Sequence, residues 1–275
     1  MDKPDTVGKY RITAFAKERT LVLESLIAAS WRHHVKALLE LDVTRARAAI
    51  HTARREHGKG ISFLSWILSC MGKACSAHPQ VHAWRKGRRK VVIFDDVDVG
   101  TYVEREINGE LVPTPIVVRK TNEKSAEEIF TEIQNARTQD LATDAHFLGN
   151  NMEADRIVRI SRIFPRFVRM LFWRRIMRNG LLAKRIMGTV GITSLAMFGK
   201  GTAWPIPPGI RTLNIGLGPV VRKPGLADGK IVPREHLCLT VLVDHDIVDG
   251  APSARFIAYL VKLIQNAYGL EEYMK

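Results

Sequence analysis

The chain has 275 residues, 46% of them hydrophobic, and its 42 lysines and arginines outnumber 28 acidic residues to give a net charge of +14. This apolar fraction excludes a disordered chain and is enough for a sizeable core. The first ten residues are polar and no apolar run has the length of a membrane span, so we expect no signal peptide, no transmembrane helix and a cytoplasmic location. No linker composition divides the sequence, which predicts a single domain over residues 1–275.

The first half of the chain mixes helical and strand patterns. Gly58 and Pro79 end two of the helical patterns, and Asn108-Gly109 is typical of a hairpin turn between strands. Ser125 and Glu128 have the spacing of a capping box. We expect helices over residues 18–39, 45–57, 61–78 and 125–138, and strands over residues 39–44, 90–94, 98–104 and 116–119.

The last third returns to strands and closes with an amphipathic helix. The expected strands are 190–194, 212–217, 230–232 and 237–243, and the helix covers residues 253–265. Helices and strands interleave without regular βαβ alternation. The pattern therefore predicts an α+β fold, a two-layer sandwich of a mixed sheet and helices, in place of a doubly wound sheet.

Three cysteines, Cys70, Cys75 and Cys238, lie in apolar surroundings. Their odd number and the lack of a Cys-x-x-Cys spacing indicate neither a disulfide framework nor a zinc site. We expect all three to be small core residues and expect no metal centre.

The segment from Asp244 to Gly250, DHDIVDG, places His245 four residues before Asp249, between a strand pattern and a helix. A histidine at a strand end is held by rigid backbone and faces an opening. Imidazole titrates near neutral pH, so it can take a proton from a reacting thiol or hydroxyl. Taken alone, a His-x-x-x-Asp spacing also arises by chance in structural settings.

Leu239–Phe256, LTVLVDHDIVDGAPSARF, resembles the C-terminal signature of the dihydrolipoamide acyltransferases, the core components of 2-oxo acid dehydrogenase complexes. Further segments resemble this family in the same order along the chain: LELDVT at 39–44, several stretches within 61–122, and GTVGITSLAMFG at 188–199. The resemblance implies the chloramphenicol acetyltransferase-like fold and a homotrimer, either alone or as the unit of a larger assembly. It also implies active-site channels between neighbouring subunits, entered by coenzyme A from one end and by the acyl acceptor from the other.

The resemblance also implies roles for single residues. His245 matches the general base, and Thr193 matches the family's oxyanion-stabilising serine, with the same β-hydroxyl donor and one extra methyl group. Ser194 would replace Thr193 if the strand register shifted by one residue, although adjacent strand residues face opposite sides. The alternative for Thr193 is a β-branched residue that only fills a strand.

The loop around His245 carries the remaining site residues. Asp249 matches an acid that holds the histidine loop through a salt bridge and hydrogen bonds, and Gly250 is expected to allow a tight entry into the next helix. Asp244 matches the family's Asp-His pair. Asp246 departs from the family, which usually has arginine there, and its charge is expected to favour protonated His245.

The resemblance predicts a coenzyme A-dependent acyltransferase that works by direct transfer. The chain shows neither the family's lipoyl domain nor its small partner-binding domain, so we expect no lipoate on this chain. Coenzyme A would exchange the acyl group with a dihydrolipoyl group on another chain or with a small acceptor. The alternative is a non-catalytic trimeric scaffold, suggested by the missing lipoyl domain and by the departures at Thr193 and Asp246.

Residues 156–187 form a basic, amphipathic segment. Pro165 is expected to divide it and Asn179-Gly180 to stop a helix. Three interpretations stay open: a solvated basic face, a patch for an acidic partner or for coenzyme A phosphates, and a helix on a membrane surface. Nucleic acid binding is not expected, because no recognised motif accompanies the charge. The basic stripe is Arg156, Arg159, Arg162, Arg166 and Arg169, opposite Ile160, Phe164, Phe167, Val168 and Leu171.

Overall fold

The computed structural model describes residues 7–15, 19–107, 110–138, 164–195, 201–227 and 229–274. The helices are α1 (Arg19–Ala29), α2 (Thr44–Glu56), α3 (Phe63–Ala77), α4 (Ala126–Thr138), α6 (Arg166–Met177), α7 (Gly180–Met187) and α8 (Gly250–Gln265), with 3-10 turns at Pro79–His82 and Glu271–Tyr273. The strands are β1 (His34–Asp42), β2 (Trp84–Lys86), β3 (Lys90–Val92), β4 (Val99–Ile107), β5 (Glu110–Val118), β6 (Val190–Ser194), β7 (Leu213–Ala227) and β8 (Lys230–Asp244).

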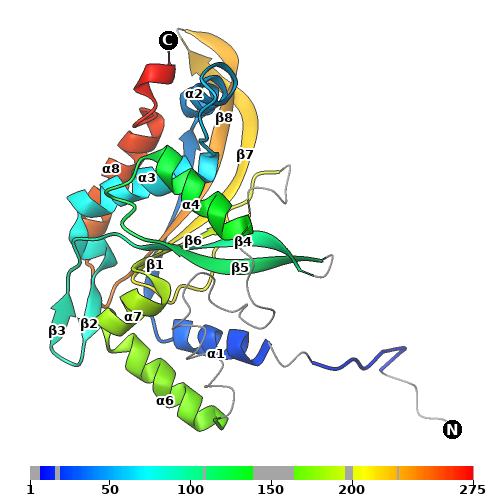
Figure 1. Cartoon of the computed structure of the whole chain (residues 1–275), viewed down its shortest axis with the longest axis vertical. Coiled ribbons are helices and arrows are strands. Elements are labelled where there is room, and N and C mark those ends of the chain that lie inside the picture. The colour runs from blue at the N-terminus through cyan, green and yellow to red at the C-terminus, as the bar shows by residue number, and fades with distance from the viewer. Residues whose placement is uncertain are drawn as a thin grey trace.

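A six-stranded mixed sheet organises the chain in the order β1-β8-β7-β6-β4-β5 (Figure 1). The central strands β7, β6 and β4 are parallel to one another, and the outer pairs are antiparallel. The strands β2 and β3 form a separate hairpin. The α+β class and the mixed sheet predicted from the sequence are confirmed.

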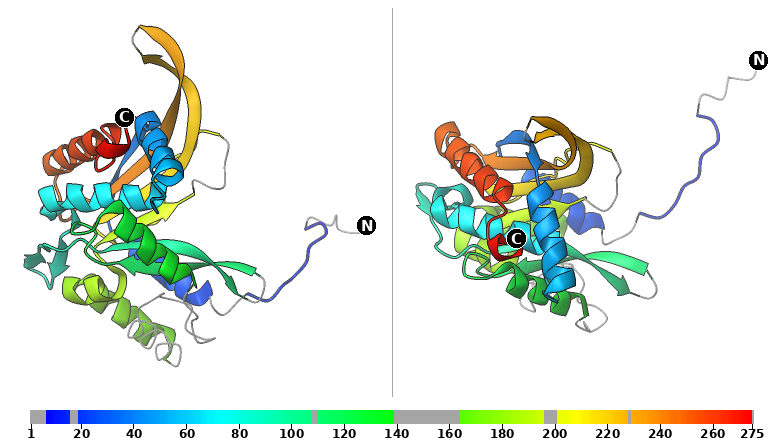
Figure 2. Two further views of the ribbon diagram at one scale, coloured as in Figure 1. Left: turned by 45° about the horizontal axis from the view of Figure 1, so that its top comes forward. Right: turned by 90° about the horizontal axis from the view of Figure 1, so that it is seen from above.

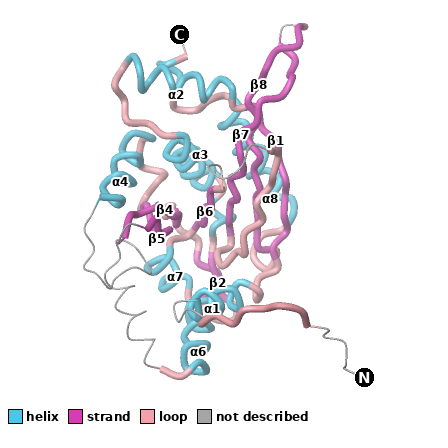
Figure 3. The backbone as a smooth tube through the Cα atoms, turned by 90° about the vertical axis from the view of Figure 1, so that its right-hand side faces the viewer, coloured by secondary structure: helices cyan, strands magenta, loops and turns pink. Residues whose placement is uncertain are grey.

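Helices α2, α3, α4 and α8 form the second layer on one face of the sheet (Figures 2 and 3). Alternate residues of a strand face opposite sides, and in β8 it is Leu237, Leu239, Val241 and Val243 that enter this core. On the other face, a Cβ on Gly216 or Gly218 of β7 would collide with the carbonyl oxygen of Pro205 or Ala203, the two neighbours of Trp204. The segment that carries Trp204 therefore runs along the face opposite to the helices.

The boundary between α1 and β1 differs from the sequence prediction. We expected one helix over residues 18–39, but α1 ends at Ala29 and β1 starts at His34. Apolar residues in this stretch fit a helical period, yet residues 34–42 pair with β8 over their whole length. Long-range pairing thus overrides the local pattern. The strands expected at 230–232 and 237–243 are likewise one strand, β8.

The hairpin and capping predictions hold. Strands β4 and β5 are antiparallel and their last pair is Ile107 with Glu110, so they flank the expected turn, whose own residues lie outside the described ranges. Ser125 and Glu128 exchange bonds at the start of α4: the Ser125 N–H donates to the Glu128 carboxylate at 2.7 Å, and the Glu128 N–H to the Ser125 hydroxyl at 3.2 Å. All three cysteines are free and buried, as predicted.

Arg169, one arginine of the predicted basic stripe, does not lie on a solvated face, whereas Arg166, Arg174 and Arg175 of the same helix are exposed. Arg169 of α6 turns inward and pairs at 2.7 Å with Glu24 of α1, whose side chain is only 2% exposed. Phe167 and Leu171, expected on the inner side, are instead 68% and 57% exposed. The buried Glu24 explains this orientation, because it needs a positive partner. Residues 156–163 lie outside the described ranges.

Helix α6 ends before Asn179-Gly180, as expected, and it begins directly after Pro165; the stretch that Pro165 was expected to separate from it lies outside the described ranges. Pro165 precedes α6 as its N-terminal cap, and Asn179 caps α7 by accepting the Leu182 N–H at 3.3 Å. Helices α6 and α7 pack with α1 and the β2–β3 hairpin around a second, smaller core. Within the described ranges, no helix has both the length and the apolar character that a membrane crossing requires.

The outer edge of the sheet on the β5 side carries two prolines. Pro113 and Pro115 lie at alternate positions of β5, opposite Glu104 and Tyr102 of β4. Proline has no backbone N–H and is therefore tolerated on edge strands, where that group would face solvent. The two prolines thus mark β5 as a natural end of the sheet.

Candidate active site

A buried ion pair fixes the end of β8. The Asp244 side chain is fully buried, and its Oδ2 lies 2.5 Å from Nη1 of Arg32, which is 4% exposed. Its other oxygen accepts the main-chain N–H groups of His33 and Asp246, both at 3.3 Å. Arg32 also stacks over Trp84 at 4.5 Å. Burial lowers the pKa of Arg32, and the Asp244 carboxylate opposes that shift.

His245 follows directly and its side chain is exposed in the single chain. Its main-chain N–H donates to the carbonyl of His33 at 2.9 Å, and the N–H groups of Ile247 and Val248 return to the carbonyl of Asp244. His245 therefore lies in a turn whose two ends are held by main-chain hydrogen bonds. This is the rigid setting that the sequence predicted for it.

Asp249 precedes α8 as its N-terminal cap, and its side chain is exposed. The Asp249 carbonyl accepts the N–H and the hydroxyl of Ser253, but the carboxylate has no bonding partner among the described residues. Within one chain, Asp244 holds the histidine loop. Gly250 has open space around it, since a Cβ there would meet no atom within 4 Å, so the helix entry does not require glycine.

Asp246, the departure from the family pattern, has its own partner. Its Oδ1 lies 3.0 Å from Nδ1 of His33, and both side chains face solvent. The carboxylate thus pairs with a second histidine on the neighbouring segment. Its described contact is with His33.

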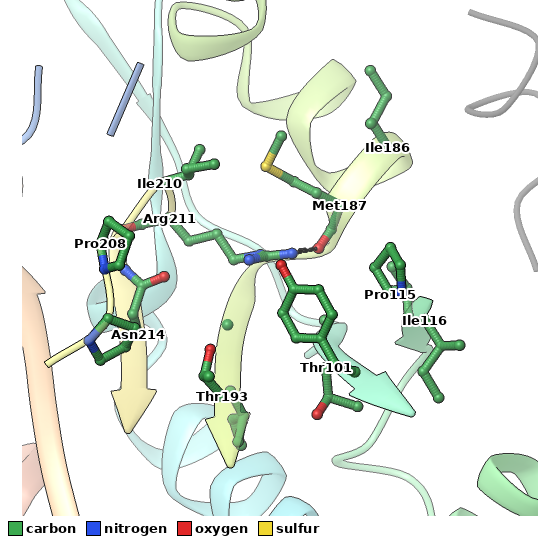
Figure 4. A pocket seen from close by; sticks show the side chains of 16 residues that line it. Thr101, Pro115, Ile116, Ile186, Met187, Thr193, Pro208, Ile210, Arg211 and Asn214 are labelled. Atoms are coloured by element: carbon green, nitrogen blue, oxygen red, sulfur yellow. Dashed lines mark hydrogen bonds between the residues drawn. The ribbon is translucent and has the colours of Figure 1, made fainter. Parts of the chain in front are cut away.

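Thr193 lies on β6 and lines a pocket of about 80 Å³ on the sheet face opposite to the helices (Figure 4). In the figure its hydroxyl points toward the side chain of Arg211. Ser194 does not line this pocket, in keeping with the opposite orientation of adjacent strand residues. The geometry therefore favours Thr193 over Ser194 as a donor to a ligand in this pocket.

One chain does not bring His245 and Thr193 together. Val243 of β8 is level with Leu213 of β7, which is level with Val190 of β6. His245 lies two residues beyond Val243 in one direction, and Thr193 lies three residues beyond Val190 in the other. With about 3.3 Å per residue and about 4.8 Å between strands, the two are roughly 20 Å apart. A single reaction centre that uses both needs a second copy of the chain.

Sequence reasoning missed two arginines of this region. Arg32 pairs with Asp244 across 212 residues of sequence, and no local pattern announces that pairing. Arg211 enters the pocket of Thr193 from the segment before β7. Its only sequence signal is a single charge beside the apolar start of a strand.

The fold is shared with solved acyltransferase cores. Dihydrolipoamide acetyltransferase of Azotobacter vinelandii aligns with a TM-score of 0.67 and 18% identity, over 97% of this chain and 96% of that chain. A probable dihydrolipoamide acetyltransferase from Listeria monocytogenes gives a TM-score of 0.63 and 17% identity, over 94% and 96%. At these identities the likeness defines the fold.

The family follows from the sequence match. Residues 11–147 and 177–271 match the model described as 2-oxoacid dehydrogenases acyltransferase (catalytic domain), and this chain belongs to that family. The dihydrolipoyllysine-residue acetyltransferase component of the pyruvate dehydrogenase complex of Staphylococcus epidermidis is 23% identical over 271 residues, which are 96% of this chain and 52% of that protein. The chain thus spans about half the length of the curated relatives that it matches.

Proposed function

We propose that this chain is a coenzyme A-dependent acyltransferase. It would exchange an acyl group between coenzyme A and a thiol, either a dihydrolipoyl group on another chain or a small acceptor. The observation that carries the proposal is His245 on its tied turn after β8, in a chain that matches the acyltransferase catalytic-domain family.

Residue spacing supports the assignment of roles. In the Azotobacter vinelandii protein, a serine, a histidine and an asparagine were investigated for their role in the catalytic mechanism. The serine lies 52 residues before the histidine, and the asparagine four residues after it. Here Thr193 lies 52 residues before His245, and Asp249 lies four residues after it. The match supports His245 as the base, Thr193 as the hydroxyl donor and Asp249 as the third member of the site.

The proposed reaction is a direct exchange of thioesters. Neutral His245 takes the proton of the attacking thiol, and the sulfur adds to the acyl carbonyl. The Thr193 hydroxyl donates a hydrogen bond to the oxyanion of the tetrahedral intermediate. The intermediate then expels the other thiol as thiolate, and protonated His245 returns its proton to that sulfur. Both sulfur atoms and the proton are conserved in this cycle.

Replacement of His245 tests the mechanism. Loss of a general base costs typically 10²- to 10⁴-fold in rate, so we expect His245→Ala to lose at least about 100-fold in the release of free coenzyme A from acyl-coenzyme A with dihydrolipoamide or a separate lipoyl domain. His51→Ala, at an exposed position on α2, is the matched control and should keep the parental rate. An active His245→Ala protein would contradict the mechanism.

The separation of His245 and Thr193 in one chain supports a shared site, which we propose lies between subunits of a homotrimer. One solved relative is described as the cubic core of the pyruvate dehydrogenase multienzyme complex. A mixture of His245→Ala and Thr193→Val subunits tests the sharing. Randomly mixed interfaces would pair an intact His245 with an intact Thr193 about a quarter of the time. We therefore expect about a quarter of the parental activity after co-assembly, and at most about 1% from either variant alone.

A non-catalytic scaffold is the second candidate, and the observation that favours it is the extra methyl group at Thr193, where the sequence resemblance implies serine. Coenzyme A binding separates the two candidates. Saturable binding of coenzyme A by calorimetry, lost on competition with acyl-coenzyme A, supports the enzyme. No saturable binding of either compound supports the scaffold.

A further inference from the structure

Arg211 occupies an unusual position beside Thr193. Its side chain extends across the pocket to the end of α7, where Nε and Nη2 donate to the carbonyl of Met187 at 2.9 and 2.5 Å (Figure 4). Its main chain is fixed as well, because the Arg211 carbonyl accepts from Nδ2 of Asn214 at 2.6 Å. The guanidinium is therefore held in one place before any ligand arrives.

Two glycines on neighbouring strands make room for this guanidinium. A Cβ on Gly191 of β6 would lie 2.8 Å from Nη1, and a Cβ on Gly100 of β4 would collide with Nη2. Any side chain at either position would displace the arginine. The two strands thus form a recess shaped around the charge.

The charge of Arg211 is not neutralised within the described part of the chain. Arg32 and Arg169 also lie in protein surroundings, but each pairs with a carboxylate, of Asp244 and Glu24. Arg211 has only the carbonyl of Met187, and its Nη1 meets no acceptor among the described residues. Burial lowers the pKa of Arg211 to about 10, opposed only by the Tyr102 side chain. Arg211 is partly buried, and a partly desolvated charge without a counter-ion is costly, so the recess favours a bound anion.

The pocket sets the size and polarity of that anion. The centre of a water-sized sphere can occupy about 80 Å³ of the pocket, and one water needs about 10–15 Å³ of such space, so roughly five to eight heavy atoms fit. Apolar groups of Pro115, Pro208 and Ile210 share the lining with Thr193 and Arg211. A short carbon chain that ends in a carboxylate fits both the apolar wall and the cation. A planar carboxylate also matches the geometry of a guanidinium.

We propose that Arg211 binds the carboxylate at the far end of the acyl group, so that the preferred donor is a short dicarboxylic acid joined to coenzyme A as a thioester. The inference rests on the proposed function, because it places the reacting carbonyl at Thr193. Arg211 then determines specificity, and the reaction itself proceeds at the other end of the acyl chain.

Pairs of donors whose acyl groups have the same number of carbon atoms test the proposal on the parental protein. Malonyl-, succinyl- and glutaryl-coenzyme A would be compared with propionyl-, butyryl- and valeryl-coenzyme A, with kcat/KM measured for each. A hydrogen bond to a charged group is worth roughly a 10- to 100-fold preference, and we expect that preference for at least one carboxylated donor over its neutral partner. Equal kcat/KM values within every pair would overturn the inference and leave the proposed function intact, whereas no transfer from any donor would count against the function.

Variants test whether Arg211 causes the preference for carboxylated donors. Arg211→Gln should reduce the carboxylated-to-neutral ratio roughly 10-fold or more, and Gly191→Ala should reduce it while keeping the charge. Arg55→Gln, at an exposed position on α2, is the matched control and should keep the ratio. An unchanged ratio in folded Arg211→Gln protein would overturn the assignment. If Arg211→Gln failed to fold, calorimetry of the parental protein with succinate and with butyrate would decide, and equal binding of both would overturn it.

A carboxylate that binds Arg211 could also belong to the acyl acceptor. One further comparison distinguishes the acyl group from the acceptor. The parental protein would be assayed with dihydrolipoate and with dihydrolipoamide, which differ in the charge at the end of the chain. Equal use of both acceptors supports the acyl group as the ligand of Arg211. A preference for dihydrolipoate that disappears in Arg211→Gln would place the carboxylate on the acceptor and overturn the proposal.

Discussion

Removal of the Asp244 charge should destabilise the protein more than any other single change in the histidine loop. Asp244→Asn keeps the shape of the side chain but leaves Arg32, which is 4% exposed, without its counter-ion. Breaking a buried pair by removing one partner costs about 3–5 kcal/mol. For a domain of this size, a loss of 1 kcal/mol lowers Tm by about 2–4 °C, so we expect a fall of about 10 °C.

Asp246→Asn is the matched control two residues away. Its partner His33 is 75% exposed, and an exposed pair is worth at most about 1 kcal/mol. The assay is thermal unfolding at one fixed protein concentration, because assembly also raises apparent stability. The double replacement Arg32→Met with Asp244→Leu should recover only part of the loss, because apolar groups can replace the buried pair but the main-chain N–H groups of His33 and Asp246 lose their acceptor. Equal unfolding midpoints for Asp244→Asn and Asp246→Asn would refute the reasoning.

Two further predictions concern buried groups outside the candidate site. Burial, with repulsion from Lys184, lowers the pKa of His82 to about 4 from its usual 6.5; the unfolded chain therefore takes up the proton first as the pH falls, and stability should decrease by about 1.4 kcal/mol per unit between pH 6.5 and 4. Urea unfolding at a series of pH values checks this, and a His82→Asn variant with the same pH slope would contradict it. Burial also raises the pKa of the Cys70 and Cys75 thiols, so a thiol reagent followed by mass spectrometry should label them only after unfolding. Rapid labelling of the native protein would show that the thiols are accessible.

Local patterns predicted those parts of the fold that depend on neighbouring residues. The strand at 190–194 has the predicted bounds, and the capping box at Ser125 forms because both partners belong to one turn of chain. The end of α1 was missed because β1 exists through its pairing with β8, about 200 residues away. The exposed Val35 and Leu38 of this edge strand do not show the alternation that marks a half-buried strand.

The residues of the candidate site also separate into those that the sequence reveals and those that only the structure reveals. His245 could be found from the sequence because its strand, turn and helix are contiguous, and its exposed setting agrees with that prediction. Arg211 could not be found in this way, because its recess depends on glycines of two other strands, Gly100 and Gly191. Neither glycine lies in a turn signal. Their role becomes visible only when the three segments are side by side.

The prolines of β5 have a consequence for how copies of this chain can join. An open sheet edge invites another strand to continue the hydrogen-bond ladder, which is a common route to aggregation. Pro113 and Pro115 occupy alternate positions of that edge and supply no N–H donors to an incoming strand. Association through β5 therefore has to use side chains in place of backbone pairing. In the proposed homotrimer, neighbouring copies therefore cannot join their sheets through β5.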